Sequence, residues 1–129
     1  MITMRQALLN TAQKELVTSE PDSGWQNFCP AADFIGFDGH FPGYPVLPAM
    51  LQVLLGIIVS EKLYGQKLTL QKLDKAKFMS QIQPGQTLTV ACKITQPATE
   101  EPKQAIKAKI TITVAEKRAA SMTLHLNQA

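Results

Sequence analysis

The sequence predicts an α+β protein in which one long central helix is wrapped by an antiparallel β-sheet. Residues 47–64, LPAMLQVLLGIIVSEKLY, have no polar face before Ser60, as expected of a helix buried on nearly all sides, and Gly65 follows as a C-cap. After them, apolar and polar residues alternate with the period of two that half-buried strands require. The alternating runs are LTLQKLDKAKF, TLTVACKIT, AIKAKITITVAE and ASMTLHLN.

The remaining elements follow from turn and breaker signals. We expect a small helix over residues 3–10 and two shorter strands within residues 12–29. Beyond the long helix, Pro84-Gly85 predicts a turn, and the polar residues 96–103 predict a loop between neighbouring strands. The strands after the helix are then expected to follow one another as a meander.

The size and composition fit a single domain over residues 1–129, with 45% hydrophobic and 18% charged residues. The net charge of +3 is mild and the lysines are spread out, so we expect no nucleic-acid partner. The apolar run 46–59 is too short to cross a bilayer, and the first fifteen residues lack the apolar core of a signal peptide. We therefore expect no membrane association and a cytoplasmic location.

The two cysteines do not indicate a metal or redox site. Cys29 and Cys92 lack the CxxC spacing and lie in apolar surroundings, which is typical of buried free thiols in a reducing compartment. We expect no disulfide, no metal and no cofactor.

Residues 39–49, GHFPGYPVLPA, place a histidine in a stiffened loop directly before the long helix. Three prolines fix φ and two glycines permit turns, so His40 is held in place, and Pro48 suits the first turn of the helix. Imidazole changes charge near neutral pH, which suits His40 to act as a general base.

This segment resembles the active-site motif of the 3-hydroxyacyl-acyl carrier protein dehydratases, whose loop reads His-Phe-Pro-Gly-x-Pro, two hydrophobic residues and Pro-Gly. Residues 74–88 resemble the strand, Pro-Gly turn and strand of the same family, and the likeness runs from about Trp25 to the C-terminus. The resemblance implies a single hot-dog domain that assembles at least as a homodimer, because dimers of that family join two sheets edge to edge. An isolated sheet would also leave its edge strands uncovered.

The resemblance also implies a chemistry for the site. In the family the histidine removes a proton from the carbon next to a thioester, and a carboxylic acid on the partner chain's helix protonates the departing hydroxyl. A backbone N–H at the helix start polarises the thioester carbonyl, a role that falls to Ala49 here. The thioester partner is acyl carrier protein or coenzyme A. The implied substrate-binding residues are Phe41, Gly43, Pro48, Ala49, Met50 and Leu54.

The sequence departs from the family at its second catalytic residue. The family's carboxylate comes fourteen positions after the histidine, where this chain has Leu54. Loss of a general acid typically lowers a rate by ~10²–10⁴, so we expect weak dehydration. Ala49 also replaces the usual glycine, and Ile58 stands where many members have glutamine. Asp38, two residues before His40, is the candidate replacement acid because it shares that residue's side of an extended chain.

Three other polar residues are not expected to act in catalysis. Glu61 lies about 10 Å beyond Leu54 along the helix axis. Gln52 is rotated roughly 200° from Leu54 and is expected to cap a buried polar group. His125 alternates within the last strand and is interpreted as a strand residue.

Three functions remain open from the sequence. The first is a dehydratase-like protein that binds 3-hydroxyacyl or enoyl thioesters on acyl carrier protein. The second is a thioesterase of the same fold, for which Asp38 is the local carboxylate. The third is a non-catalytic acyl-binding subunit that pairs with a second hot-dog chain carrying the missing acid.

Overall fold

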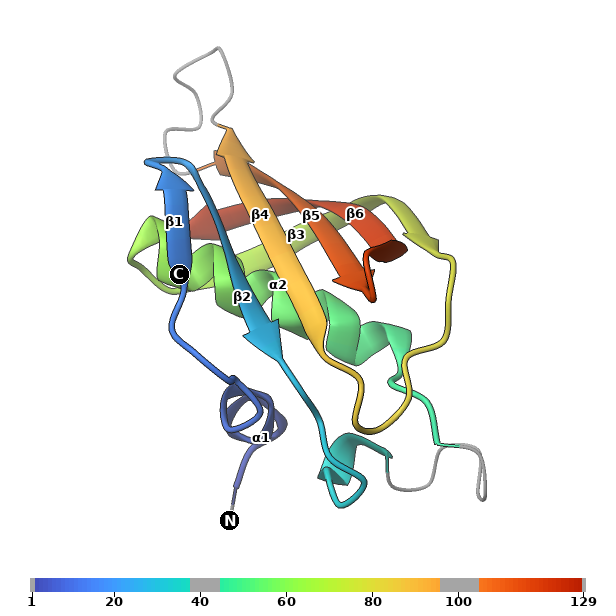
Figure 1. The fold of residues 1–129 in the computed structure, drawn as a ribbon. Helices are drawn as coiled ribbons and strands as arrows, with labels where there is room; N and C mark the ends of the chain where they lie inside the picture. The colour runs from blue at the N-terminus through green and yellow to red at the C-terminus, as the bar shows by residue number, and fades with distance from the viewer. Residues whose placement is uncertain (1, 38–44, 96–104, 129) are drawn as a thin grey trace.

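The computed structural model describes residues 2–37, 45–95 and 105–128, and it has the predicted α+β architecture (Figure 1). Within these residues, one six-stranded antiparallel sheet curves around a single long helix. Neighbouring strands follow the order β1-β2-β4-β5-β6-β3. This is the hot-dog arrangement that the sequence resemblance implied.

The elements agree closely with the predicted ones. The long helix begins at Ala49, two residues later than expected, and both short strands within residues 12–29 are present. In chain order the elements are α1 (Met4–Leu9), β1 (Val17–Glu20), β2 (Ser23–Phe28), the 3₁₀ turn η1 (Ile35–Phe37), α2 (Ala49–Tyr64), β3 (Leu68–Phe78), β4 (Leu88–Thr95), β5 (Ala105–Val114) and β6 (Lys117–Gln128).

Helix α2 ends as the sequence predicted and begins slightly differently. Gly65 adopts the left-handed conformation with φ of 88°, and its N–H donates a 2.8 Å hydrogen bond to the carbonyl oxygen of Glu61. Pro48 was predicted in the first turn but occupies the N-cap position, because its ψ of 150° is extended and not helical. The chain therefore turns into the helix at Pro48.

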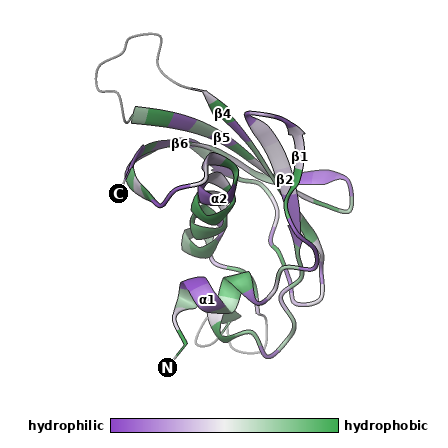
Figure 2. Cartoon of the chain, turned by 90° about the vertical axis from the view of Figure 1, so that its left-hand side faces the viewer, coloured by the Kyte–Doolittle hydropathy of each residue, from purple (hydrophilic) through white to green (hydrophobic). Residues whose placement is uncertain are grey.

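The core lies between α2 and the inner face of the sheet (Figure 2). Alternate residues of β4, β5 and β6 point inward, and each inward residue faces another across the ladder, as Ile110 faces Met122. Gly56 allows the helix to approach closely, since a Cβ atom there would lie 3.1 Å from the side chain of Ile110 and 3.2 Å from that of Leu124. The absence of a side chain at Gly56 thus sets the distance between helix and sheet.

The predicted meander is wrong for one strand. Strands β4, β5 and β6 do pair in succession, but β3 pairs with β6, as in the register Leu70↔Leu126, and forms an edge of the sheet. The segment after β3 leads away from that edge, and the predicted Pro84-Gly85 turn occurs within it, with φ of 84° at Gly85. An alternating pattern identifies a strand but not its neighbour, so the sequence could not reveal this crossover.

Two burial predictions also need correction. Helix α2 is not covered on all sides, because Met50 is 76% exposed and Leu54 and Ile57, on the same face, are only half-buried. Cys92 is buried as expected, whereas Cys29 is only half-buried. The predicted loop 96–103 lies outside the described residues. In the part of the chain that the structure covers, no helix is both long and apolar enough to cross a membrane.

Candidate functional site

The structure describes half of the predicted site. Pro48, Ala49, Met50 and Leu54 lie at the start of α2, whereas His40, Asp38, Phe41 and Gly43 lie outside the described residues. The geometry of the site is therefore built from the helix start and the segments that pack against it.

The first turn of α2 presents backbone N–H groups that are not capped by a side chain from the described residues. The carbonyl oxygen of Pro48 accepts hydrogen bonds from the N–H groups of Leu51, at 3.1 Å, and Gln52, at 3.2 Å. The preceding N–H groups of the turn, at Ala49 and Met50, remain at the positive end of the helix dipole. This arrangement suits the binding of a carbonyl oxygen or an anion.

A cavity of about 230 Å³ adjoins this helix start. Pro48 and Ala49 belong to its wall, while Met50 and Leu54 do not. The wall is largely apolar. It is formed by residues at the start of α2 and by residues at and just after the end of β3. Its lining residues are Val46, Leu47, Pro48, Ala49, Gln52, Phe78, Met79, Ser80 and Gln81.

The chain entering the helix is fixed by hydrogen bonds at both polar groups of Leu47. Its N–H donates to the carbonyl oxygen of Ile82 at 2.7 Å, and its carbonyl oxygen accepts from Nε2 of Gln52 at 3.1 Å. The side chains of Val46 and Leu47 are buried. The backbone leading into the cavity wall is thus held in one position.

Gln52 was not among the predicted site residues, although its amide does cap a buried carbonyl as expected. It is 3% exposed, and its Oε1 atom has no hydrogen-bond partner among the described residues. The signal in the sequence was a single amide in an apolar run. Gln52 was not expected in the site because it is rotated away from Leu54. It nevertheless lines the cavity, from another side of the helix.

The half-exposed face of α2 is an apolar stripe formed by Met50, Leu54 and Ile57, at i, i+4 and i+7. Leu54 and Ile57 also pack against the core. Glu61 continues the same row one turn further, but its carboxylate is engaged by Arg5 and by the N–H of Leu68. The described part of the stripe therefore offers an apolar surface beside the cavity.

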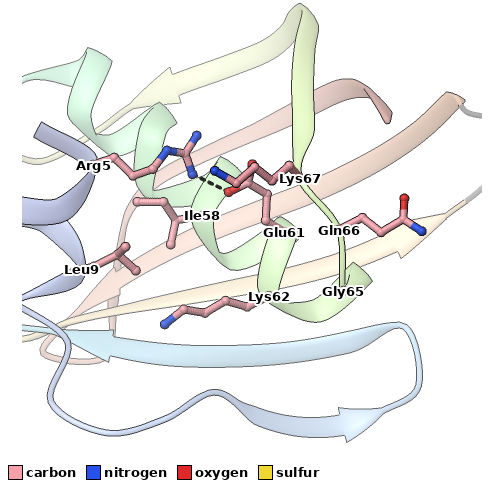
Figure 3. A pocket seen from close by; sticks show the side chains of 8 residues that line it. All are labelled: Arg5, Leu9, Ile58, Glu61, Lys62, Gly65, Gln66 and Lys67. Atoms are coloured by element: carbon pink, nitrogen blue, oxygen red, sulfur yellow. Dashed lines mark hydrogen bonds and ion pairs between the residues drawn. The ribbon is translucent and has the colours of Figure 1, made fainter. Parts of the chain in front are cut away.

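A second cavity, of about 460 Å³, lies at the other end of α2, between that end and helix α1 (Figure 3). Its polar side chains are largely paired: Arg5 forms an ion pair with Glu61, and Nζ of Lys62 donates a 3.0 Å hydrogen bond to Oε1 of Gln26. Desolvation lowers the pKa of Lys62, opposed in part by nearby Glu15. Ile58, which stands where many members of the family have glutamine, lines this second cavity and not the one at the start of α2.

His125 lies on the sheet, away from the start of α2. Its Nε2 atom is 3.5 Å from Oδ2 of Asp74 on β3, which is too long for a direct hydrogen bond. Among the residues that the structure describes, no three His, Cys, Asp or Glu side chains gather in a way that could hold a metal ion.

Comparison with known proteins agrees with this architecture. The family model described as ApeI-like, ApeI dehydratase, matches residues 18–123, which is most of the chain. The chain therefore belongs to the ApeI-like family, within the 3-hydroxyacyl-acyl carrier protein dehydratase-like proteins of the hot-dog fold that its motif indicated.

Curated relatives match a shorter region. The 3-hydroxyacyl-(acyl-carrier-protein) dehydratase FabZ of Desulforamulus reducens is 42% identical over 65 residues, covering 45% of this chain and 46% of the relative. FabZ of Oenococcus oeni is 32% identical over 83 residues, covering 59% of this chain and 58% of the relative. The matched region thus spans about half the length of these enzymes.

Solved structures show the same fold at low identity. The dehydratase heterocomplex ApeI:P from Xenorhabdus doucetiae matches with a TM-score of 0.69 at 18% identity, over 88% of this chain and 95% of that one. A hypothetical thioesterase with coenzyme A from Streptococcus pneumoniae matches with a TM-score of 0.70 at 8% identity, over 98% of this chain and 94% of that one. At such identities the likeness concerns the fold alone.

Proposed function

We propose that this protein binds 3-hydroxyacyl or enoyl thioesters of acyl carrier protein or coenzyme A and is a dehydratase with weak activity. The observation that carries the proposal is the start of helix α2, which no side chain of the described residues caps, beside a largely apolar cavity in a chain of the ApeI-like family. A donor pair at the positive end of a helix is suited to a thioester carbonyl, and an apolar wall is suited to an acyl chain. A cytoplasmic location is part of the same proposal.

In the proposed reaction, the N–H of Ala49 binds the thioester carbonyl oxygen. The imidazole of His40 removes a proton from the carbon next to the carbonyl, the bond from C3 to the hydroxyl oxygen breaks, and that oxygen takes a proton and leaves as water. Leu54 cannot supply that proton, so the proposed source is Asp38, or an acid on another chain.

The remaining predicted residues contact the substrate in this proposal. Met50 and Leu54 contact the acyl chain along the apolar stripe, because both side chains are apolar and are incompletely buried in the single protomer. Phe41, Gly43 and Pro48 contact the thioester end.

The edge strand β3 is the proposed surface for assembly. It is a strand of 11 residues at the end of the sheet, and Leu73, Phe78 and the following Met79 are 40%, 41% and 50% exposed. A long edge strand with exposed apolar side chains pairs readily with another edge. We propose that two copies of this chain join there.

A second hot-dog subunit is the alternative occupant of that edge. The residues Lys72, Lys75 and Lys77 on β3 outnumber its acid Asp74, so two identical edges carry like charge. A partner with an acidic edge and a helix carboxylate would relieve the repulsion and supply the missing acid. The Xenorhabdus protein of this fold is itself described as a dehydratase heterocomplex.

One assay separates these functions. The purified protein is incubated with 3-hydroxybutyryl and crotonyl thioesters of acyl carrier protein and of coenzyme A, and mass spectrometry follows loss of water, addition of water and hydrolysis. Interconversion of the 3-hydroxybutyryl and crotonyl thioesters that is abolished in His40→Asn and retained in His125→Asn supports the dehydratase. Hydrolysis would instead identify a thioesterase, the second candidate, which is favoured only by the missing helix acid together with Asp38, two residues before His40 in the sequence. Turnover only after addition of a second hot-dog chain would identify the partner subunit.

A further inference from the structure

Two glutamines are buried among the residues that the structure describes, and they differ in how completely they are bonded. Gln26 is 2% exposed; its Nε2 atom donates to the carbonyl oxygen of Lys14 at 2.8 Å, and its Oε1 atom accepts from Nζ of Lys62 at 3.0 Å. Gln52 is 3% exposed, and only its Nε2 atom is bonded, to the carbonyl oxygen of Leu47. Its Oε1 atom is an acceptor without a donor among the described residues.

The orientation of the Gln52 amide follows from chemistry. The carbonyl oxygen of Leu47 can only accept a hydrogen bond, so the NH₂ group of the amide must face it and the oxygen must point elsewhere. A buried acceptor left unpaired costs about 1–3 kcal/mol, whereas an apolar side chain at the same position costs nothing of this kind. An acceptor left unpaired by the described residues, in the apolar N-terminal half of the helix, is suited to a donor on a bound ligand.

The position of Gln52 indicates which donor this is. Gln52 lies three residues after Ala49, so both are on one face of the helix start, and both line the cavity of about 230 Å³. Ala49 thus contributes a backbone donor beside the cavity, and Gln52, which also lines it, carries the unpaired acceptor. A 3-hydroxyacyl thioester has the complementary pair, a carbonyl oxygen that accepts and, two carbons away, a hydroxyl group that donates.

We propose that Gln52 recognises the 3-hydroxyl group of the substrate, its Oε1 atom accepting a hydrogen bond from that hydroxyl while the Ala49 N–H contacts the thioester carbonyl. This inference rests on the proposed function and names the feature of the substrate that the site selects. An amide oxygen does not give up a proton, so Gln52 is a specificity residue and does not replace the acid missing at Leu54. Once water has left, the enoyl product lacks the donor and is bound less tightly.

The test measures binding of unreactive substrate analogues by calorimetry. The sulfur of the pantetheine thioester is replaced by NH, and the acyl group is 3-hydroxybutyryl, butyryl or 3-fluorobutyryl. The wild-type protein is expected to bind the hydroxyl analogue about tenfold more tightly than the other two, because fluorine cannot donate a hydrogen bond. In Gln52→Met the preference is expected to fall to about one, with butyryl affinity changed less than twofold.

Gln26→Met is the matched control, since it removes a buried glutamine whose oxygen and nitrogen atoms are both bonded and which does not line the cavity. It is expected to keep the tenfold preference. Equal binding of the hydroxyl and fluoro analogues by the wild-type protein overturns the inference without the use of any variant. A preference that survives in folded Gln52→Met, or equal loss of all three ligands, also overturns it. If the wild-type protein binds none of the analogues, the proposed function itself has failed.

Discussion

The Oε2 atom of Glu61, in the last turn of α2, accepts a 3.0 Å hydrogen bond from the backbone N–H of Leu68, the first residue of β3. The other carboxylate oxygen of Glu61 is paired with Arg5 on α1, as Figure 3 shows. The carboxylate is mostly buried, with 13% of its side chain exposed. One side chain thus connects two helices to the edge strand.

Substitution of this carboxylate should destabilise the fold. Glu61→Ala is expected to lower the free energy of unfolding by about 2–3 kcal/mol, since hydrogen bonds to charged groups contribute about 1.5–3 kcal/mol and Arg5 would lose its partner. Urea unfolding followed by circular dichroism measures the change. Glu20→Ala, at an exposed position of β1, should change stability by less than about 0.5 kcal/mol. Similar values for the two variants would contradict the role of Glu61 as a connector.

The thiol of Cys92 should make stability depend on alkaline pH. Its Sγ atom is 3.4 Å from Oγ of Ser60, whose own proton is donated to the carbonyl oxygen of Gly56 at 2.7 Å. Burial raises the pKa of the Cys92 thiol to about 11 from 9.0, opposed in part by the Ser60 hydroxyl. Between these values the unfolded chain releases the proton and the folded chain keeps it, so stability present below pH 9 is lost as the pH rises toward 11.

The loss attributable to this thiol is expected to be about 2 kcal/mol by pH 10.5. Urea unfolding at pH 8 and pH 10.5 gives the change for the wild-type protein and for Cys92→Ala. The variant should lose less stability over this interval, whatever its stability at pH 8. Identical pH dependence of the two proteins would show that the thiol ionises equally in the folded and unfolded chains.

A carboxyl group restored at position 54 should increase the rate of water loss. Leu54→Glu and Leu54→Asp are expected to raise dehydration of 3-hydroxyacyl thioesters by up to ~10², because a general acid contributes at least that factor and an apolar wall helps to keep it protonated. The cost is about 1–3 kcal/mol of stability, since a polar group replaces a half-buried apolar one.

The matched control is Met50→Glu, which introduces the same group one turn earlier at a position that is 76% exposed. Unlike the Leu54 variants, it should not raise the rate of water loss, and it should weaken substrate binding because Met50 contacts the acyl chain in the proposed function. If the Leu54 variants fold but do not exceed the wild-type rate, the acid is already supplied elsewhere or the chemistry is absent. Wild-type activity that disappears in Asp38→Asn would select the first explanation.

Assembly through β3 should respond to salt in an unusual direction. With three lysines and one aspartate on each edge strand, a homodimer brings like charges together, so screening should strengthen it. Analytical ultracentrifugation at 50 mM and 500 mM NaCl measures the dissociation constant, which we expect to be lower at high salt. Leu73→Lys should weaken the dimer at least tenfold, and Val17→Lys, on the opposite edge strand, should not. If the protein is monomeric under all conditions, the proposed homodimer is excluded, and pairing with a second hot-dog subunit is the alternative that stands.

Much of the fold could be predicted because its signals are local. The alternation of Ile106, Ala108, Ile110 and Ile112 marks a strand and its inward face, and a glycine after an apolar run marks the end of α2. The place of β3 beside β6 was not predictable in this way, because it depends on where the chain crosses the sheet and not on any residue pattern.

The site was less predictable than the fold for a similar reason. The motif identifies the start of α2, but the bond between Gln52 and Leu47 forms only because the extended ψ of Pro48 places that carbonyl before the first turn. The pairing of Arg5 with Glu61 joins residues 56 positions apart, and isolated charged residues carry no periodic signal. Contacts of this type are fixed by the packing of whole elements.

The two ends of helix α2 have unequal freedom to change during evolution. Its C-terminal end is tied to α1, to β3 and, through Lys62 and Gln26, to β2, so substitutions there threaten the fold itself. At its N-terminal end, Met50 is 76% exposed and Leu54 is half-buried, so these two positions are less constrained. An exchange between leucine and an acid at position 54 is therefore expected to change the chemistry of the site with less effect on the fold than a substitution at the C-terminal end of the helix.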